Sequence, residues 1–187
     1  MKRLLITAAM LLPICADAKV HLQYLSAKGG YANGSADWGS SRHFSGMNGF
    51  AGTIAYGNNL DLAARWYDDT WFFVRQEFEA NYSSQYSDGL RMSPIGANVN
   101  FYFDFGLKSW FIQPYIGAGL GAAYIITRHE DFSYDDYVVG LNYNFQLGAS
   151  FPIIEQLTAD ASVRYVKYGG DPGLTNWAAL LGLRFDF

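Results

Sequence analysis

Reactive side chains come close together in the sequence at few places. His43 and Ser45 stand two positions apart, so an extended chain would place both side chains on one face. A histidine beside a serine hydroxyl can act as the general base for attack on an ester. His129 precedes Glu130 and Asp131, but it has no second histidine or cysteine at metal-ligand spacing. The sequence therefore offers one catalytic hypothesis, and we expect neither a metal centre nor a cofactor.

A larger set of polar side chains recurs at alternate positions within otherwise apolar segments. Such groups are costly to bury unless they pair with one another. We interpret them as a structural network of ion pairs and hydrogen bonds, not as a catalytic centre. The predicted members are Arg75, Glu77, Glu79, Asn98, Asn100, Asp104, Asp160, Arg164, Arg184 and Asp186.

The elements that must position this network are β-strands. Between residues 95 and 105 every odd position is apolar, and the even positions carry Gly96, Asn98, Asn100, Tyr102 and Asp104. Helical periodicity cannot produce that alternation. Similar patterns predict eight strands, at about residues 22–31, 48–56, 71–82, 95–105, 110–126, 141–151, 157–165 and 177–187.

The connections predicted between these strands alternate between long and short. Residues 32–45, 83–93, 127–137 and 169–176 are rich in polar residues and predict loops, whereas 106–109 and 153–156 predict tight turns. The segment 57–70 is too long for a tight turn. It fits either an extension of its neighbouring strands or a short interfacial helix, and the sequence does not decide between them.

The N-terminus has the pattern of a secretory signal peptide. Lys2 and Arg3 precede a short apolar core, and Ala16 to Ala18 form an A-x-A cleavage site. We expect residues 1–18 to be removed, together with Cys15, leaving one domain at 19–187. Removal takes Lys2, Arg3 and Asp17 from 13 basic and 17 acidic residues, leaving 11 and 16 and a net charge of −5. Nucleic acid is therefore not an expected partner.

Two all-β architectures suit this pattern, a soluble sandwich and a membrane barrel. The final strand favours the barrel, because a row of Trp177, Leu181, Leu183 and Phe185 ending on Phe187 would be a hydrophobic edge in water. Aromatic residues near predicted strand ends also suit membrane interfaces, namely Trp71, Trp110, Tyr124 and Trp177. We predict an eight-stranded antiparallel up-and-down transmembrane β-barrel.

The interior of such a barrel is just wide enough for side chains to fill. The predicted network should therefore plug it and leave no wide pore. Gly117, Gly119 and Gly121 share one face of the fifth strand, where we expect them to make room for long side chains from the opposite wall.

Three segments resemble the opacity-protein-like outer-membrane barrels. Residues 111–121, FIQPYIGAGLG, are similar to the P-Y-(I/V)-G-x-G-x-G strand of that family, and residues 74–79, VRQEFE, to its R-x-E-x-E strand. Residues 157–165 with the ending 183–187 match its last hairpin. The resemblance implies an outer-membrane surface protein, of a kind often described as an opacity-type porin, with some members acting as host-cell adhesins.

The ending itself resembles the C-terminal signal of bacterial outer-membrane barrels, carried here by Leu183, Phe185 and Phe187. It implies recognition by the barrel-assembly machinery. The other expected partners are outer-membrane lipid, lipopolysaccharide and host-cell surface receptors, and the oligomeric state is left open. The acids Glu130, Asp131, Asp135 and Asp136 are expected to be solvated, or to bind divalent cations at the lipopolysaccharide surface.

Two function hypotheses follow. The first is a non-enzymatic surface barrel that is structural or adhesive through its loops. The alternative is a lipid A-modifying enzyme that uses His43 and Ser45. Lipid A deacylases carry an H-x-S-N motif late in the chain, whereas here the pair lies in the first predicted loop and Gly46 replaces the Asn. We expect a protein that is not an enzyme.

Overall fold

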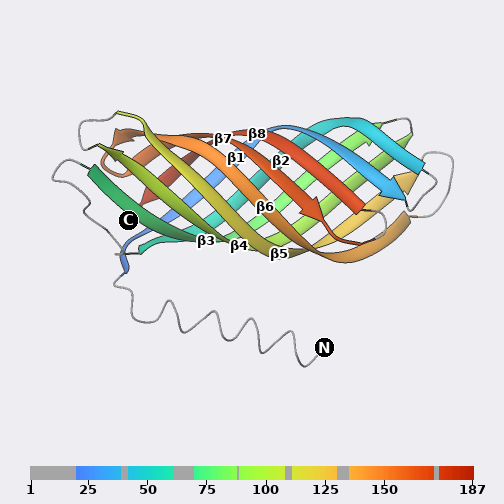
Figure 1. Cartoon of the computed structure of the whole chain (residues 1–187), viewed down its shortest axis with the longest axis horizontal. Helices are drawn as coiled ribbons and strands as arrows, with labels where there is room; N and C mark the ends of the chain where they lie inside the picture. Colours follow the sequence, from blue (N-terminus) through green and yellow to red (C-terminus); the bar gives the residue numbers. More distant parts are fainter. Residues whose placement is uncertain are drawn as a thin grey trace, which may run out of the picture.

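The predicted strands are present and close into a barrel. The computed structural model describes residues 20–38, 42–60, 70–87, 89–107, 111–129, 135–170 and 173–187. Each strand in this part of the chain pairs antiparallel with the next, and β8 pairs with β1 (Figure 1). The all-β, eight-stranded antiparallel prediction is confirmed. The strands are β1 Val20–Trp38, β2 Arg42–Leu60, β3 Thr70–Ser87, β4 Leu90–Leu107, β5 Gln113–His129, β6 Asp135–Ile154, β7 Leu157–Tyr168 and β8 Gly173–Asp186.

The register of the sheet makes the barrel narrow. Following paired residues once around the barrel from Leu25 returns to β1 at Ser35, ten residues further along. A closed sheet with such an offset has strands tilted by about 35–45° from the barrel axis. β1 begins and β8 ends at the same end of the barrel (Figure 1), so the hairpins β1–β2, β3–β4, β5–β6 and β7–β8 share the opposite end.

Alternation decides which side chains face outward. Along β8, Trp177, Leu181 and Phe185 are 55%, 70% and 48% exposed, whereas Ala178 and Leu180 between them are buried. Phe145 on β6 is also exposed. The apolar stripe of each strand therefore lies on the outer surface, which water would not stabilise but acyl chains would.

The height of this apolar surface suits a bilayer. On β4 the outward residues from Phe105 to Ile95 are all apolar, and ten residue steps cover about 33 Å along the strand. With the tilt, this projects to about 25 Å across the membrane, the usual height of the apolar band. Where the band ends toward the hairpins, we define an aromatic girdle of Tyr31, Tyr82, Tyr124, Tyr143, Tyr165 and Trp177.

Side chains are described for only two of the four aromatic residues that were predicted to lie at the membrane interfaces. Trp177 and Tyr124 are exposed on the outer surface. The side chain of Trp71 and the whole of Trp110 lie outside the described residues, as does the predicted signal peptide 1–18 with Cys15.

The prediction of long polar loops is wrong for most of their length. Residues 32–38 and 42–45 belong to β1 and β2, and 83–87 and 90–93 belong to β3 and β4. Likewise β5 runs to His129, β6 begins at Asp135 and β8 begins at Gly173. The Gly, Ser and Asn content predicted loops, but alternation persists there with its polarity reversed. Inward residues such as Met47 and Leu90 are apolar and buried, so these segments pack as strands.

The short connections differ less from prediction. β6 extends to Ile154 and leaves Glu155 and Gln156 as the turn before β7. The first residues of the 57–70 connection, up to Leu60, belong to β2, and residues 61–69 lie outside the described residues. Within the described part of the chain, no helix is long and apolar enough to cross a membrane.

The glycines of β5 make room for neighbours rather than for the opposite wall, which corrects the prediction. Gly117, Gly119 and Gly121 pair with Tyr102, Asn100 and Asn98 on the adjacent strand β4. A Cβ built on any of the three would collide with the side chain of its β4 partner. Large inward side chains of β4 therefore lie flat over β5.

Candidate functional site

The interior of the barrel contains a dense set of ion pairs, of which Arg75 forms the first. Arg75 Nε donates to Asp104 Oδ2 at 2.5 Å, and its Nη1 lies 3.4 Å from Glu77 Oε1. The guanidinium also sits 4.8 Å from the centre of the Tyr102 ring and 5.0 Å from that of Tyr115. Arg75 and Glu77 are buried, so this charge is balanced by carboxylates and aromatic faces instead of water.

A second ion pair joins β1 to β7 across the interior. Lys28 Nζ lies 3.0 Å from Asp160 Oδ1, and Tyr115 Oη donates to the same oxygen at 2.7 Å. Gln146 Nε2 donates to the Tyr115 hydroxyl at 3.1 Å and to Ser162 Oγ at 2.9 Å. Residues from β1, β5, β6 and β7 therefore converge on one buried carboxylate.

The third ion pair lies between Arg164 and Glu79. Arg164 Nη2 is 2.7 Å from Glu79 Oε1, and Asn98 Nδ2 donates to that oxygen at 3.3 Å. Arg164 Nη2 has no hydrogen-bond partner within the described part of the chain, so its contact with Glu79 is an ion pair. Asn144 Nδ2 donates to Asn100 Oδ1 at 2.9 Å and continues the network toward β6.

These contacts leave the interior close to electroneutral. Arg184 and Asp186 are 3.6 Å apart near the end of β8, where both are partly exposed. Among the described residues, the cations of these ion pairs are Lys28, Arg75, Arg164 and Arg184, and the carboxylates are those of Glu77, Glu79, Asp104, Asp160 and Asp186. We call the buried members of this network the polar plug; they are Tyr24, Lys28, Arg75, Glu77, Glu79, Asn98, Asn100, Tyr102, Asp104, Tyr115, Asn144, Gln146, Asp160 and Arg164.

All ten residues of the predicted network lie on the inward side of their strands. Eight are buried, and Arg184 and Asp186 are half-buried. Sequence reasoning left Lys28 out, together with the tyrosines at positions 24, 102 and 115. Lys28 lies on the same alternating face of the first strand as Tyr24 and Ser26, so the rule that selected Arg75 could also have found it.

A second, apolar layer lies inside the barrel toward the hairpins. Its members lie near the hairpin ends of their strands and are all buried, and Phe44 packs against them. We call this layer the apolar cap; it consists of Ala36, Met47, Leu90, Met92, Ala123, Ile125, Val166, Tyr168 and Leu174. Beyond the membrane band the interior of the barrel is therefore apolar, like the core of a soluble protein.

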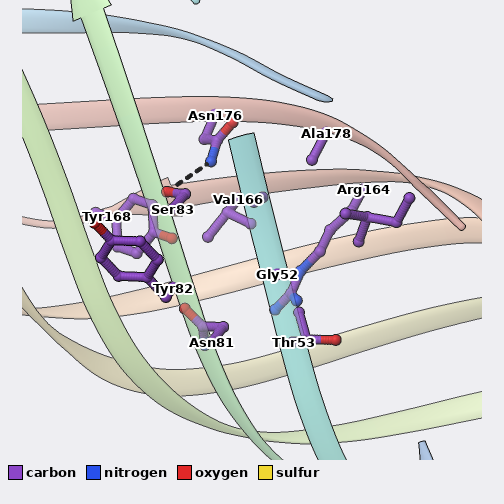
Figure 2. A pocket seen from close by; sticks show the side chains of 12 residues that line it. Gly52, Thr53, Asn81, Tyr82, Ser83, Arg164, Val166, Tyr168, Asn176 and Ala178 are labelled. Atoms are coloured by element: carbon purple, nitrogen blue, oxygen red, sulfur yellow. Dashed lines mark hydrogen bonds between the residues drawn. The ribbon is translucent and has the colours of Figure 1, made fainter. Parts of the chain in front are cut away.

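The space between the plug and the cap is small. Figure 2 shows a cavity there, lined by side chains that include Asn81, Ser83, Arg164, Tyr168 and Asn176. The volume open to the centre of a water molecule is about 10 Å³, about the minimum for one water. Asn176 Nδ2 donates to Ser83 Oγ across it at 3.3 Å. This cavity therefore has room for about one water molecule and for no larger solute.

The candidate catalytic pair lies on the exposed end of the β1–β2 hairpin. His43 Nδ1 contacts Asp37 Oδ1, which sits directly across the ladder, and both side chains are more than half exposed. Ser45 is exposed as well. An aspartate that orients a histidine is one part of a catalytic triad, and sequence reasoning did not include Asp37.

The candidate cation ligands can be described only in part. Asp136 is exposed at the start of β6, while Glu130 and Asp131 and the side chains of His129 and Asp135 lie outside the described residues. Among the described residues, no group of three or more His, Cys, Asp or Glu side chains is placed to hold a metal.

The C-terminal residues Leu183, Phe185 and Phe187 point outward and are about half exposed. The backbone N–H of Phe187 donates to the carbonyl of Gln23 at 2.9 Å, which ties the end of the chain to β1.

Comparison with known proteins supports this architecture. The family model described as outer membrane protein beta-barrel domain matches residues 5–185. Neisserial surface protein A is similar with a TM-score of 0.60 at 19% identity, over 88% of this chain and 97% of that one. Ail, the attachment invasion locus protein of Yersinia pestis, gives 0.50 at 17% identity, over 89% and 100%. A comparison with curated proteins gives no match.

Proposed function

Because this chain belongs to the outer membrane protein beta-barrel domain family and lies in the outer membrane, we propose that it is a non-enzymatic surface protein. In this proposal its hairpins bind a ligand outside the cell and its interior conducts no solute. The opacity-type adhesive role predicted from the sequence is the specific form of this function.

The observation that carries the proposal is the apolar cap above the polar plug. A conducting barrel needs a continuous wet path, but here Leu90, Met92 and Ile125 are fully buried inside the hairpin end. Below them, Arg75, Lys28 and Arg164 are held by carboxylates from other strands. Opening a path would require unpairing buried charges and exposing the cap to water.

The cap also suits a binding role. Without it, long extracellular hairpins would be mobile and would lose entropy when they bind a partner. With it, β1–β2 and β3–β4 continue as paired strands well beyond the aromatic girdle. Their outward side chains, such as His43 and Tyr86, are therefore held on a rigid support. Support from a similar fold is that Ail has been solved in complex with the heparin analogue sucrose octasulfate.

Conductance and cell binding test the two halves of the proposal. The folded barrel in a planar bilayer should give no steady porin-like conductance; a stable open channel would contradict the sealed interior. Replacing residues 34–46 or 127–137 with short turns should abolish binding of bacteria to host cells. Shortening the β7–β8 connection serves as the control, and unchanged binding in all three variants would end the adhesive proposal.

The contact between Asp37 and His43 favours an enzyme as the second candidate. The distance of Asp37 and His43 from the membrane argues against action on lipid A, because Asp37 lies six residues beyond Tyr31 of the girdle along β1. Six residues at this tilt are about 15 Å above the apolar band, too far for an acyl ester at the membrane boundary. Lipid A from cells with His43→Ala or Ser45→Ala should match lipid A from wild-type cells by mass spectrometry. An altered acyl pattern would support the enzyme hypothesis instead.

A further inference from the structure

A group of polar side chains interrupts the outer surface where the apolar band ends on β3 and β4. Going toward the hairpin, Ile95 on β4 is followed on the same face by Ser93 and Arg91. Arg91 Nε donates to Ser84 Oγ at 2.9 Å, and Ser93 Oγ donates to the same oxygen at 3.2 Å. The Tyr82 hydroxyl interacts with the side chains of all three. We call these four residues the hydroxyl platform.

The platform is built into the sheet. Pairing of β3 with β4 runs from Tyr82 opposite Ile95 directly to Gln85 opposite Met92, and skips the positions between them. Pro94 has no N–H to donate, which accounts for the gap. Ser84 and Ser93 are 6% and 8% exposed although they face outward, because the Arg91 and Tyr82 side chains bond across them. Their hydroxyl groups are therefore held in place before any ligand arrives.

Among the described residues, no acid lies directly opposite the charge of Arg91. Arg91 sits opposite Tyr86 on β3 and opposite Arg128 on β5, so no carboxylate occupies its paired position on either neighbour. Like charges directly across a ladder destabilise it. The backbone position opposite Arg128 on β6 is residue 135. An anion beside Arg91 would relieve the repulsion.

The position of the guanidinium selects the kind of anion. Arg91 reaches back from the exposed hairpin toward Ser84 and Tyr82, at the height of the aromatic girdle. Head groups of the outer leaflet lie at this height, and those of lipopolysaccharide carry phosphates. A guanidinium fork with neighbouring hydroxyls is well matched to phosphate oxygens.

We propose that the hydroxyl platform binds a phosphate of lipopolysaccharide in the outer leaflet. The Arg91 guanidinium donates to the phosphate oxygens, with the Tyr82 hydroxyl supplying a further O–H donor. The site would hold a lipid against the β3–β4 wall whether or not the hairpins bind a host ligand, so it goes beyond the proposed function.

Native mass spectrometry of the full folded barrel in detergent tests the site with bisphosphorylated lipid A as the probe. Arg91→Ala should weaken binding about tenfold, the effect of losing about 1.4 kcal/mol of charge-assisted hydrogen bonding. Dephosphorylated lipid A should bind the wild type no more tightly than bisphosphorylated lipid A binds the Arg91→Ala variant. Equal binding of the two lipids, or no loss in the variant, would overturn the proposal. Heat-modifiable gel mobility confirms that each variant is folded.

Two further variants separate a built site from general attraction. Lys167→Ala removes an outward charge from β7 and should weaken binding less than twofold; a loss equal to that of Arg91→Ala would overturn a specific site. Ser84→Ala with Ser93→Ala should weaken binding about threefold by releasing Arg91, and wild-type affinity there would also overturn it. Millimolar inorganic phosphate should not displace the lipid, whereas full displacement would assign the site to free phosphate.

Discussion

Inside the barrel, Lys28 Nζ lies 3.0 Å from Asp160 Oδ1, although the two residues are 132 positions apart in the sequence. The pair bridges the interior from β1 to β7, which are separated by β8 in the closed sheet. Both side chains are almost fully buried. Substitutions in this pair therefore test how the polar plug stabilises the barrel.

Lys28→Met should destabilise the barrel by about 3–5 kcal/mol, because it leaves the Asp160 carboxylate buried without its cation. Unfolding by urea in lipid vesicles, followed by tryptophan fluorescence, measures the change. Adding Asp160→Asn should recover at least half of the loss, since the remaining groups are then neutral. Lys167→Met, on the exposed face of β7, is the control and should change the unfolding free energy by less than about 0.5 kcal/mol.

A methyl group added at Gly119 should destabilise the barrel by colliding with a neighbouring side chain on β4. The Cβ of Gly119→Ala would collide with Asn100, and its second near neighbour is Asn144, so we expect a cost of about 1–3 kcal/mol from overpacking. Asn100→Ala in the same chain should return part of it by making room. Gly52→Ala is the control, because a Cβ there meets its nearest atom, the Lys28 carbonyl oxygen, at 3.6 Å. If the two glycine variants were equally stable, the close packing of β4 over β5 would be wrong.

Alternation explains why so much of the fold could be predicted. In residues 95–105 each outward residue is apolar and each inward one is polar or small, so period two predicted the strand and its two faces. The eight segments with such a pattern predicted an even number of strands, as a closed single-chain barrel requires. The opacity-type resemblance is confirmed at the level of family and fold.

The hairpin ends could not be predicted because the environment changes along each strand. Ala36 and Met47 face inward above the membrane, where the interior is apolar and the exterior is wet, which is the reverse of the pattern below. Composition alone therefore predicted loops. The partners within the plug were equally hidden, since Lys28 and Asp160 meet only through the register of a closed sheet.

Truncating the apolar cap should loosen the hairpins without unfolding the membrane band. Leu90 is fully buried in the cap, and Leu90→Ala should cost about 2–5 kcal/mol from lost burial and a cavity. The β3–β4 hairpin should then be cut faster by proteases added outside cells. Ile95→Ala, which removes an outward side chain of the same strand, should leave cleavage unchanged. Equal protease resistance of the Leu90 variant would mean that the cap does not order the hairpins.

The terminal aromatic should matter for assembly more than for stability. Phe187 is 57% exposed on the lipid side, and its backbone N–H already bonds to Gln23, so Phe187→Ser removes little packing. If the ending is the signal for the barrel-assembly machinery, the variant should reach the outer membrane at a level several-fold lower than the wild type. Its refolding in detergent should remain normal, as shown by heat-modifiable mobility. Phe111→Ser, at another exposed position near the same end, is the control for lost hydrophobicity. A matching drop in that control, or normal membrane levels of the Phe187 variant, would show that the last residue is not read as a signal.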